Sequence, residues 1–256
     1  MRSRKGYPFL RQTLGLTPSI VIFSWVMWAI FSSQSLTAQS LQMNQTPPPY
    51  IAKTSNFMAI AFQVKAGDAQ TLVTANLKVK SNEQGLVTGG MEIYTTDQTS
   101  GIPSYSIAFI YLEVMSQEQA GNWPIWGAVS DVKALEHFKH FYNFPYIHKK
   151  IKIETRGNQQ MASIGEGEEE GLMLSLQKQM DKAVASEGLA RIYSYSTEGQ
   201  MLLTEIPWLA SGHQGKVLSL EIRAGKNKTL QLLEGVQPSY SQISTNAFSY
   251  SKPLKQ

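Results

Sequence analysis

Short apolar runs separated by Gly, Asn, Asp and Ser dominate the chain after residue 50. Such runs are typical of β-strands bounded by turn residues. They read MAIAFQVKA, GGMEIYTT, YSIAFIYLEVM, HKKIKIET, GLMLSLQKQM, LARIYSYST, GQMLLTEIPW and KVLSLEIRAG. Eight such runs predict a mainly β (α+β) fold, a closed barrel or double sheet with a few short helices.

The strongest helical pattern lies between Asp131 and Tyr142, and Asp131 is a suitable N-cap. Its apolar residues recur at spacings that place them on one helix face: Ala134, Leu135, Phe138 and Phe141. Two shorter helices are predicted in DAQTLVTANL and KTLQLLEGV. The segment GNWPIWG is interpreted as a packed turn.

Residues 1–38 have the pattern of a targeting segment. Basic residues precede an uncharged apolar run at residues 14–31, and small residues follow up to Ala38, the predicted end of a cleaved signal peptide. The apolar run also approaches the length of a membrane span, so an uncleaved signal anchor stays open. We expect residues 39–256 to form one domain that is secreted or periplasmic, with membrane contact only through the N-terminal segment.

Charge and cysteine content narrow the classes of partner and site. The targeting segment holds four of the 23 basic residues and none of the 19 acidic ones, so the predicted domain has 19 of each. This balance argues against nucleic acid as a partner. The chain has no cysteine, which excludes disulfides, thiolate metal sites and a cysteine nucleophile.

Two surface features have simple interpretations. The glutamates in GEGEEEG, residues 165–171, are expected at a solvated hairpin tip, because the surrounding residues lack the pattern of a calcium loop. Asn44 and Asn227 match glycosylation acceptors, which matters only if the host modifies exported proteins.

The stretch around Phe144 and Pro145 carries the candidate chemistry. A helix with an aromatic face leads into a tight turn, and a strand is expected to start at Tyr146 and to continue through Lys149 and Lys150. Burial and a neighbouring cation both lower the pKa of a lysine, which leaves a neutral amine able to attack a carbonyl. Paired lysines on a solvated edge strand are the simpler interpretation.

The order of several motifs resembles that of the acetoacetate decarboxylase family. They are PPPY, the Asp131 helix, GIPSYSIAFIYLEVM before it, and GKVLSLEIRAG followed by KTLQLLEGV. The resemblance extends over nearly all of the chain after Gln45 and implies the family's fold. It also implies a Schiff-base lysine, the first of a Pro-Lys-Lys motif, that decarboxylates β-keto acids without a cofactor.

When the family's motif is aligned to this chain without a gap, most of its functional positions hold different residues. Its Gly-Arg-Glu becomes Phe138, Lys139 and His140, and its turn glycine becomes Asn143. Pro145 is kept, and the nucleophilic lysine becomes Tyr146, whose phenol cannot form an imine. The preceding strand has Ile107 where the family offers a carboxylate, and Glu113 lies further along.

An alternative alignment with a three-residue insertion keeps a lysine at the nucleophile position. If Tyr146–His148 is an insertion, the lysine pair becomes Lys149 and Lys150, and Lys149 shares the apolar strand face with Ile151 and Ile153. We favour the ungapped register, because it already aligns both isoleucines with apolar positions and insertions inside a core strand are disfavoured.

Several side chains are expected to line a ligand cavity even without the amine: Lys139, His140, Phe144, Tyr146, His148 and Trp126. We expect a small organic acid or an apolar molecule as the ligand. No metal site is predicted, since His137 and His140 lack a third convergent ligand.

These observations predict an exported member of the resembled family that has lost the Schiff-base lysine and binds a small ligand. Two alternatives stay open. One is an active carboxy-lyase in which Lys149 is the amine and Lys150 its activating neighbour, and the other is a non-catalytic structural envelope protein. Assembly into a homo-oligomer is also left open.

Overall fold

The computed structural model describes residues 46–167 and 170–256. Residues 46–256 form one compact unit. The predicted targeting segment, its boundary at residues 38 and 39, and Asn44 all lie outside the described residues. Within the described ranges no helix is long and apolar enough to cross a membrane.

Strands make up most of the described chain, and the helices are short. In chain order the elements are β1 (Tyr50–Lys65), α2 (Ala66–Gln70), β2 (Lys78–Val79), β3 (Leu86–Thr95), β4 (Gln98–Ser100), β5 (Ser106–Ser116), β6 (Gln119–Val129), α3 (Val132–His137), the π-helix η1 (Phe138–Tyr142), β7 (Tyr146–His148), β8 (Ile151–Arg156), β9 (Gln159–Ile164), β10 (Gly171–Tyr195), β11 (Met201–Arg223), α4 (Lys228–Leu232), β12 (Pro238–Tyr250) and β13 (Leu254–Lys255).

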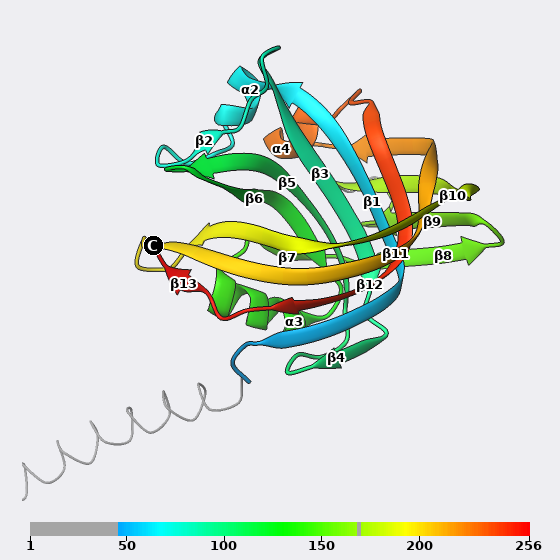
Figure 1. Cartoon of the computed structure of the whole chain (residues 1–256), viewed down its shortest axis with the longest axis horizontal. Coiled ribbons are helices and arrows are strands. Elements are labelled where there is room, and N and C mark those ends of the chain that lie inside the picture. The colour runs from blue at the N-terminus through cyan, green and yellow to red at the C-terminus, as the bar shows by residue number, and fades with distance from the viewer. Residues whose placement is uncertain (1–45, 168–169) are drawn as a thin grey trace, which may run out of the picture. The chain divides into compact units, whose positions relative to one another are not determined.

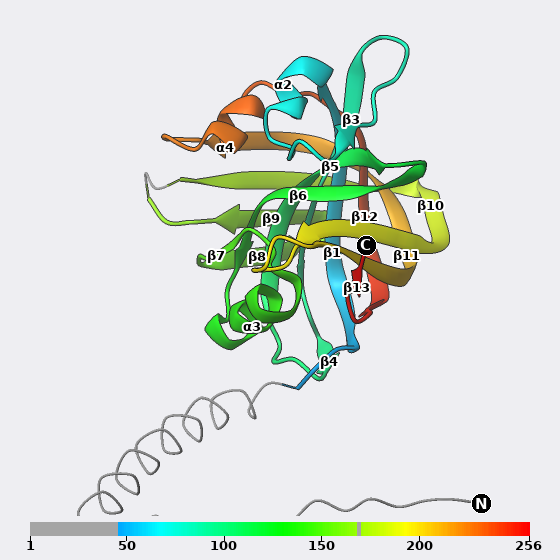
Figure 2. The ribbon, with the colours of Figure 1, turned by 90° about the vertical axis from the view of Figure 1, so that its left-hand side faces the viewer.

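Strand pairing closes the sheet on itself. In the described part of the chain, β11 pairs with β12, β12 with β1, and the ladder continues through β3, β5 and β6 to β10, which pairs with β11 again. Figures 1 and 2 show these strands curving around one another, with α3 at the opposite end of the molecule from α2 and α4. The predicted mainly β fold with a few short helices is therefore confirmed.

The strands β1, β3, β5 and β6 separate two apolar clusters. On β5, Ala108 and Ile110 belong to the first cluster, which also includes residues of α2, α4, β8 and β9. Ile107 and Phe109 belong to the second cluster, which includes residues of α3 and η1. A strand that is buried on both faces must be apolar at nearly every position, and this explains the continuous apolar run of β5.

Several predictions of strands and turns need correction. The runs GLMLSLQKQM and LARIYSYST belong to one long strand, β10, and GQMLLTEIPW and KVLSLEIRAG belong to β11. The segment GNWPIWG lies in strand β6 rather than in a turn. The strand expected from Tyr146 through Lys150 breaks after His148, because β7 pairs in parallel with β6 whereas β8 pairs antiparallel with β9.

The helices predicted from Asp131 and in KTLQLLEGV are confirmed, whereas the helix predicted in DAQTLVTANL is the short α2, which starts at Ala66 and ends at Gln70. The Asp131 side chain accepts a hydrogen bond from the backbone N–H of Ala134 at 2.8 Å and so caps α3. The helix continues as the π-helix η1, which ends at Asn143 in the left-handed conformation, with φ of 49°. A left-handed residue ends a helix and turns the chain away from its axis. Here it brings Phe144 and Tyr146 back into the core.

Candidate ligand-binding cavity

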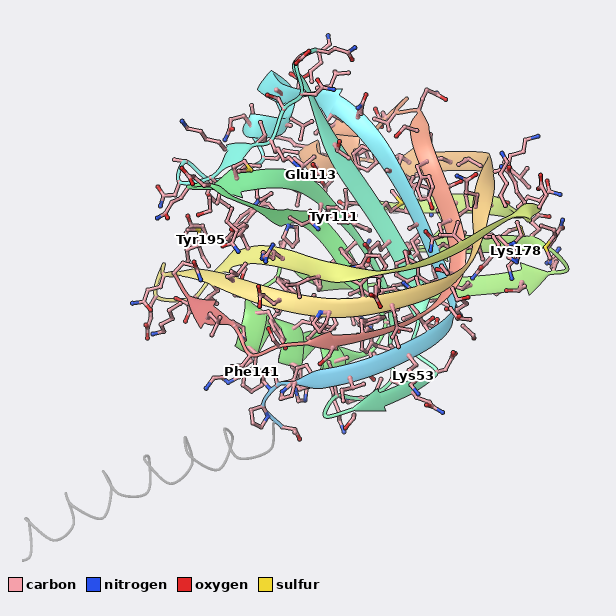
Figure 3. The ribbon with its side chains drawn as sticks, viewed as in Figure 1. Lys53, Tyr111, Glu113, Phe141, Lys178 and Tyr195 are labelled. Carbon is pink, nitrogen blue, oxygen red and sulfur yellow. The ribbon has the colours of Figure 1, made fainter. Side chains whose placement is uncertain are left out.

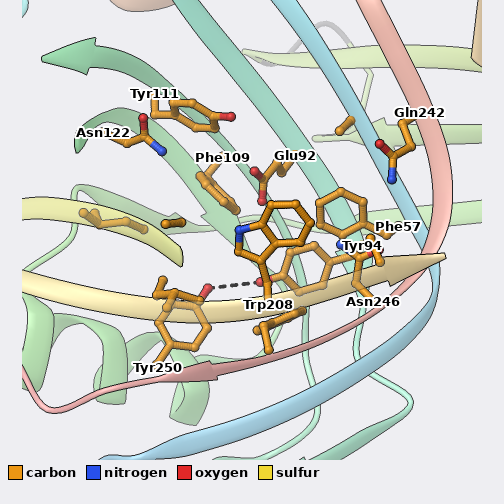
Figure 4. Close-up of a pocket in the computed structure, with 16 residues that line it drawn as sticks. Phe57, Glu92, Tyr94, Phe109, Tyr111, Asn122, Trp208, Gln242, Asn246 and Tyr250 are labelled. Carbon is orange, nitrogen blue, oxygen red and sulfur yellow. Dashed lines mark hydrogen bonds between the residues drawn. The ribbon is translucent and has the colours of Figure 1, made fainter. Parts of the chain in front are cut away.

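A partly open cavity of about 180 Å³ lies within the ring of strands. All seven strands of the ring contribute side chains to it, so its wall is assembled from the whole sheet (Figure 4). The lining residues are Phe57, Ala59, Glu92, Tyr94, Phe109, Tyr111, Asn122, Ala190, Ile192, Ile206, Trp208, Ala210, Gln242, Asn246, Phe248 and Tyr250.

Local backbone features admit the large rings of this wall. A register shift in the β5–β6 pairing falls at Tyr111, which lines the cavity (Figures 3 and 4). Bulges re-aim side chains in this way. A Cβ atom on Gly90 would lie 2.2 Å from Cζ of Tyr111, so only a glycine leaves room for that ring. Gly188 leaves similar room for Trp208, at 2.9 Å from Cζ2.

Glu92 alone is charged among the described residues that line the cavity. It lies on β3, and Figure 4 shows its carboxyl group among the rings of Phe57, Phe109 and Trp208. Burial raises the pKa of this carboxyl to about 7, and hydrogen bonding with the Tyr111 side chain offsets part of the rise. The carboxyl therefore changes its charge near neutral pH.

The other ionisable groups of the wall are phenols. The hydroxyl groups of Tyr94 and Tyr250 lie 3.1 Å apart and share a hydrogen bond. Burial raises the pKa of Tyr94, Tyr111 and Tyr250 well above the usual value, so these phenols are neutral at physiological pH. Three side-chain amides complete the polar lining: Asn122, Gln242 and Asn246.

The described cavity wall contains no lysine, arginine or histidine. A Schiff base needs an amine, and an anionic substrate is usually held by a cationic side chain. This cavity instead combines aromatic faces, small aliphatic side chains and one carboxyl group.

The structure brings two of the predicted site residues together, in the aromatic cluster beside the cavity. Phe144 and Tyr146 are buried, with ring centroids 5.1 Å apart. The Tyr146 ring fills the space over Gly127, where a Cβ atom would lie 2.3 Å from its Cδ1. Its hydroxyl group is buried without a hydrogen-bond partner among the described residues.

The other predicted ligand contacts lie elsewhere. Lys139, His140 and His148 are exposed, and the imidazole Nε2 of His148 lies 3.0 Å from the backbone oxygen of Ser130. Trp126 is buried in the first apolar cluster and donates a hydrogen bond from Nε1 to Glu170 at 3.2 Å. These four residues do not line the described cavity.

The two candidate catalytic lysines follow β7. Lys149 is partly exposed, and its backbone N–H donates a hydrogen bond to the Val129 oxygen at 3.2 Å. Lys150 is exposed and forms an ion pair with Glu166 at 2.5 Å. Hydrogen bonding to that carboxylate raises the pKa of Lys150. The negative charge of Glu166 also offsets the positive charge of Lys150, which was expected to activate the amine of Lys149.

Other residues weighed in the sequence have plain structural roles. Ile107 is fully buried, and Glu113 forms an ion pair with Lys80 at 3.4 Å. His137 is buried rather than at the helix surface, and its Nδ1 lies 2.9 Å from the Tyr50 hydroxyl. The Asn227 side chain caps α4 and donates to Glu170 at 3.0 Å.

Sequence reasoning missed the cavity and Glu92. A signal was present, because Glu92 is the single charged residue in the strand LVTGGMEIYT, between Met91 and Ile93. A lone charge within an apolar strand is uncommon unless it is paired or functional. The signal could not be used without knowing that both faces of this strand are buried.

Comparisons with known proteins support the fold. No family model matches the sequence, and no curated protein matches it. The solved structures include similar ones at low identity. Acetoacetate decarboxylase from Legionella pneumophila subsp. pneumophila str. Philadelphia 1 is similar with a TM-score of 0.61 and 13% identity, over 81% of this chain and 88% of that chain.

Two further solved structures are similar over a comparable share of the chain. An acetoacetate decarboxylase-like enzyme from Sphingomonas wittichii RW1 has a TM-score of 0.59 and 11% identity, over 81% of this chain and 93% of that chain. The enduracididine biosynthesis enzyme MppR complexed with pyruvate has a TM-score of 0.56 and 11% identity, over 82% and 90%. At such identities the likeness shows the fold.

Proposed function

We propose that this chain, which has the acetoacetate decarboxylase-like fold, binds a small apolar molecule in this cavity and does not act as a Schiff-base decarboxylase. The observation that carries the proposal is the composition of the cavity wall. Its described part combines seven aromatic residues with one carboxyl group and no amine. The export predicted from the N-terminal segment stays part of the proposal.

The size and lining of the cavity favour a small ligand. A cavity of about 150 Å³ is large enough for benzene, whereas pockets for drug-sized ligands measure roughly 300–1,000 Å³. At about 180 Å³ this cavity suits a molecule of one ring or a short branched chain. The side-chain amides of Asn122, Gln242 and Asn246 offer donors and acceptors that can orient it.

The positions of the lysines argue against imine chemistry. Neither Lys149 nor Lys150 lines the cavity, and the ungapped register places the buried Tyr146 at the position of the nucleophile. Lys150, the proposed activating neighbour, is exposed, and its hydrogen bond to Glu166 raises its pKa and offsets the charge that would activate Lys149. The alternative of a lyase that uses Lys149 therefore has weaker support than ligand binding.

The cavity lining favours one of the two expected ligand classes, apolar molecules and organic acids, over the other. A carboxylate ligand would meet the Glu92 carboxyl inside an aromatic cavity without a compensating cation in the described wall. Like charges at short range in a low-dielectric site strongly disfavour binding. Of the two expected classes, the apolar ligand fits this wall better than the organic acid does.

A thermal-shift screen of small aromatic and branched aliphatic molecules tests the proposal. A ligand at 100 times its Kd should stabilise the protein by about 2.7 kcal/mol, which for a domain of this size raises Tm by roughly 5–10 °C. Trp208 lines the cavity, so its fluorescence should change with the same ligand. The fluorescence change should be lost in Trp208→Phe, which would assign it to this residue.

A cavity-filling variant and a matched control assign the binding to the cavity. Ala190→Leu places a larger side chain into the cavity from β10 and should abolish the thermal shift. Ala185→Leu adds the same side chain at an exposed position of the same strand and should leave it unchanged. If no molecule shifts Tm, or if both variants bind as the natural protein does, the proposal fails and a structural role is favoured.

A further inference from the structure

We propose that the ligand of this cavity is a small organic cation that carries an alkylated ammonium group. The inference rests on the proposed function, since it concerns the same cavity and narrows its ligand to a molecule whose apolar alkyl groups surround a positive charge. It follows from the combination of aromatic faces with a carboxyl group that has no cationic partner in the described wall.

The aromatic wall supplies the first half of the recognition. The faces of Trp, Tyr and Phe rings attract cations through their quadrupoles, and quaternary ammonium ligands are held in cages of such rings. Phe57, Phe109, Tyr111 and Trp208 lie around the carboxyl group of Glu92 in the close-up of the cavity (Figure 4). They come from β1, β5 and β11, so the rings approach a bound molecule from several directions.

The carboxyl group supplies the second half. Glu92 is half-buried in a cavity with a largely aromatic wall, and a carboxylate that is shielded from water is costly unless a positive charge compensates it. The Tyr111 side chain hydrogen-bonds it, and the described wall offers it no cation. A ligand cation would provide the missing charge, whereas a neutral ligand would leave the carboxyl protonated.

The groups that face Glu92 from neighbouring elements leave its charge uncompensated. They are the phenols of Tyr94, Tyr111, Tyr146 and Tyr250, which are neutral at physiological pH. Glu113 acts on Tyr111 from further along β5, and its charge is paired with Lys80. Lys80 does not line the cavity, so it does not compensate the Glu92 charge.

Three probes of nearly equal shape isolate the effect of charge. Choline, 3,3-dimethyl-1-butanol and 3,3-dimethylbutanoate share a branched head but differ in charge, and each is small enough for a cavity of about 180 Å³. Calorimetric titration of the purified protein at pH 8 should detect choline at an affinity at least tenfold above that of the alcohol. The butanoate should not bind.

Variants and pH then assign the preference to Glu92. Glu92→Gln should bring choline to the affinity of the alcohol, while Glu221→Gln, an exposed control on β11, should change nothing. Choline affinity should rise about tenfold between pH 6 and pH 8 as the carboxyl loses its proton, and this rise should vanish in Glu92→Gln. Thermal unfolding checks that each variant is folded.

The outcomes separate this inference from the proposed function. Equal affinity for choline and the alcohol, tighter binding of the butanoate, or binding of none of the probes overturns the ammonium class. In each of these cases the proposed function is still judged by the wider apolar screen and by Ala190→Leu. A loss of choline preference that appears equally in Glu221→Gln would also overturn the inference.

Discussion

A carboxyl group enclosed by aromatic side chains favours its neutral form, because burial removes the water that solvates its charge. At Glu92 this raises the pKa from an ordinary value of 4.5 to about 7. The folded protein then binds more protons than the unfolded chain between these pH values. The contribution of Glu92 to the free energy of unfolding must therefore fall as pH rises from about 4.5 to about 7, and stay constant above that.

The first prediction concerns this loss of stability. Glu92→Gln, which cannot ionise, should match the natural protein near pH 5 and be more stable than it at pH 8, by up to about 3 kcal/mol. Urea denaturation at both pH values measures the difference. The exposed Glu221→Gln is the control and should show none. A difference that is the same at both pH values would show that Glu92 does not titrate near neutrality.

A second prediction concerns the buried hydroxyl group of Tyr146. A buried polar group without a hydrogen bond costs about 1–3 kcal/mol, so Tyr146→Phe should raise the free energy of unfolding by about 1 kcal/mol. The matched variant is Tyr94→Phe, which removes the hydrogen bond to Tyr250 and should lower it by about the same amount. Destabilisation by Tyr146→Phe would mean that its hydroxyl has a partner in solution.

Among the elements, the junction between β6 and β10 is the shortest in the ring of strands. A single residue pair, Asn122 and Ile192, joins the two strands in the described structure, and both residues line the cavity. The Tyr193 ring packs against Gly121 beside this pair, and its hydroxyl donates to the Gln119 oxygen at 3.2 Å. The ring of strands thus closes next to the candidate site.

The third prediction tests this junction. A Cβ atom on Gly121 would lie 2.6 Å from the Tyr193 ring and 3.0 Å from the Arg191 oxygen, so Gly121→Ala must displace the junction. Overpacking of this kind costs roughly 1–3 kcal/mol of stability, and ligand affinity should fall with it. Gly67→Ala, which meets no atom within 4 Å, is the control. If Gly121→Ala is destabilised but its ligand affinity is unchanged, the β6–β10 junction does not determine binding in the cavity.

Element boundaries followed from the sequence where local chemistry sets them. Asp131 caps its helix as predicted, because an N-cap depends on a few adjacent residues. The middle of β10 is different. Asp181, Lys182 and Gly188 look like loop residues, yet they lie on a strand whose pairing with β11 extends past them on both sides. Exposed strand positions accept such residues, so the sequence alone suggested two shorter strands.

For the whole molecule, the strand-like runs were enough to predict a mainly β barrel or double sheet, because such a chain has few ways to bury its apolar residues. The particular fold was predicted from the resemblance of the motif order to a known family. The cavity could not be predicted in the same way. Its lining residues extend from Phe57 to Tyr250 and come together only when the ring of strands closes. The stretch around Phe144 drew attention to Lys139, His140 and His148, which instead face solvent.

The central claim is that the cavity binds its ligand without forming an imine. Borohydride reduction in the presence of acetoacetate or pyruvate, followed by intact mass and peptide mapping, tests it most directly. We predict no specific adduct on the folded protein, under conditions in which a Schiff-base decarboxylase is trapped. A stable adduct confined to Lys149 would contradict the account and make a lyase the better assignment.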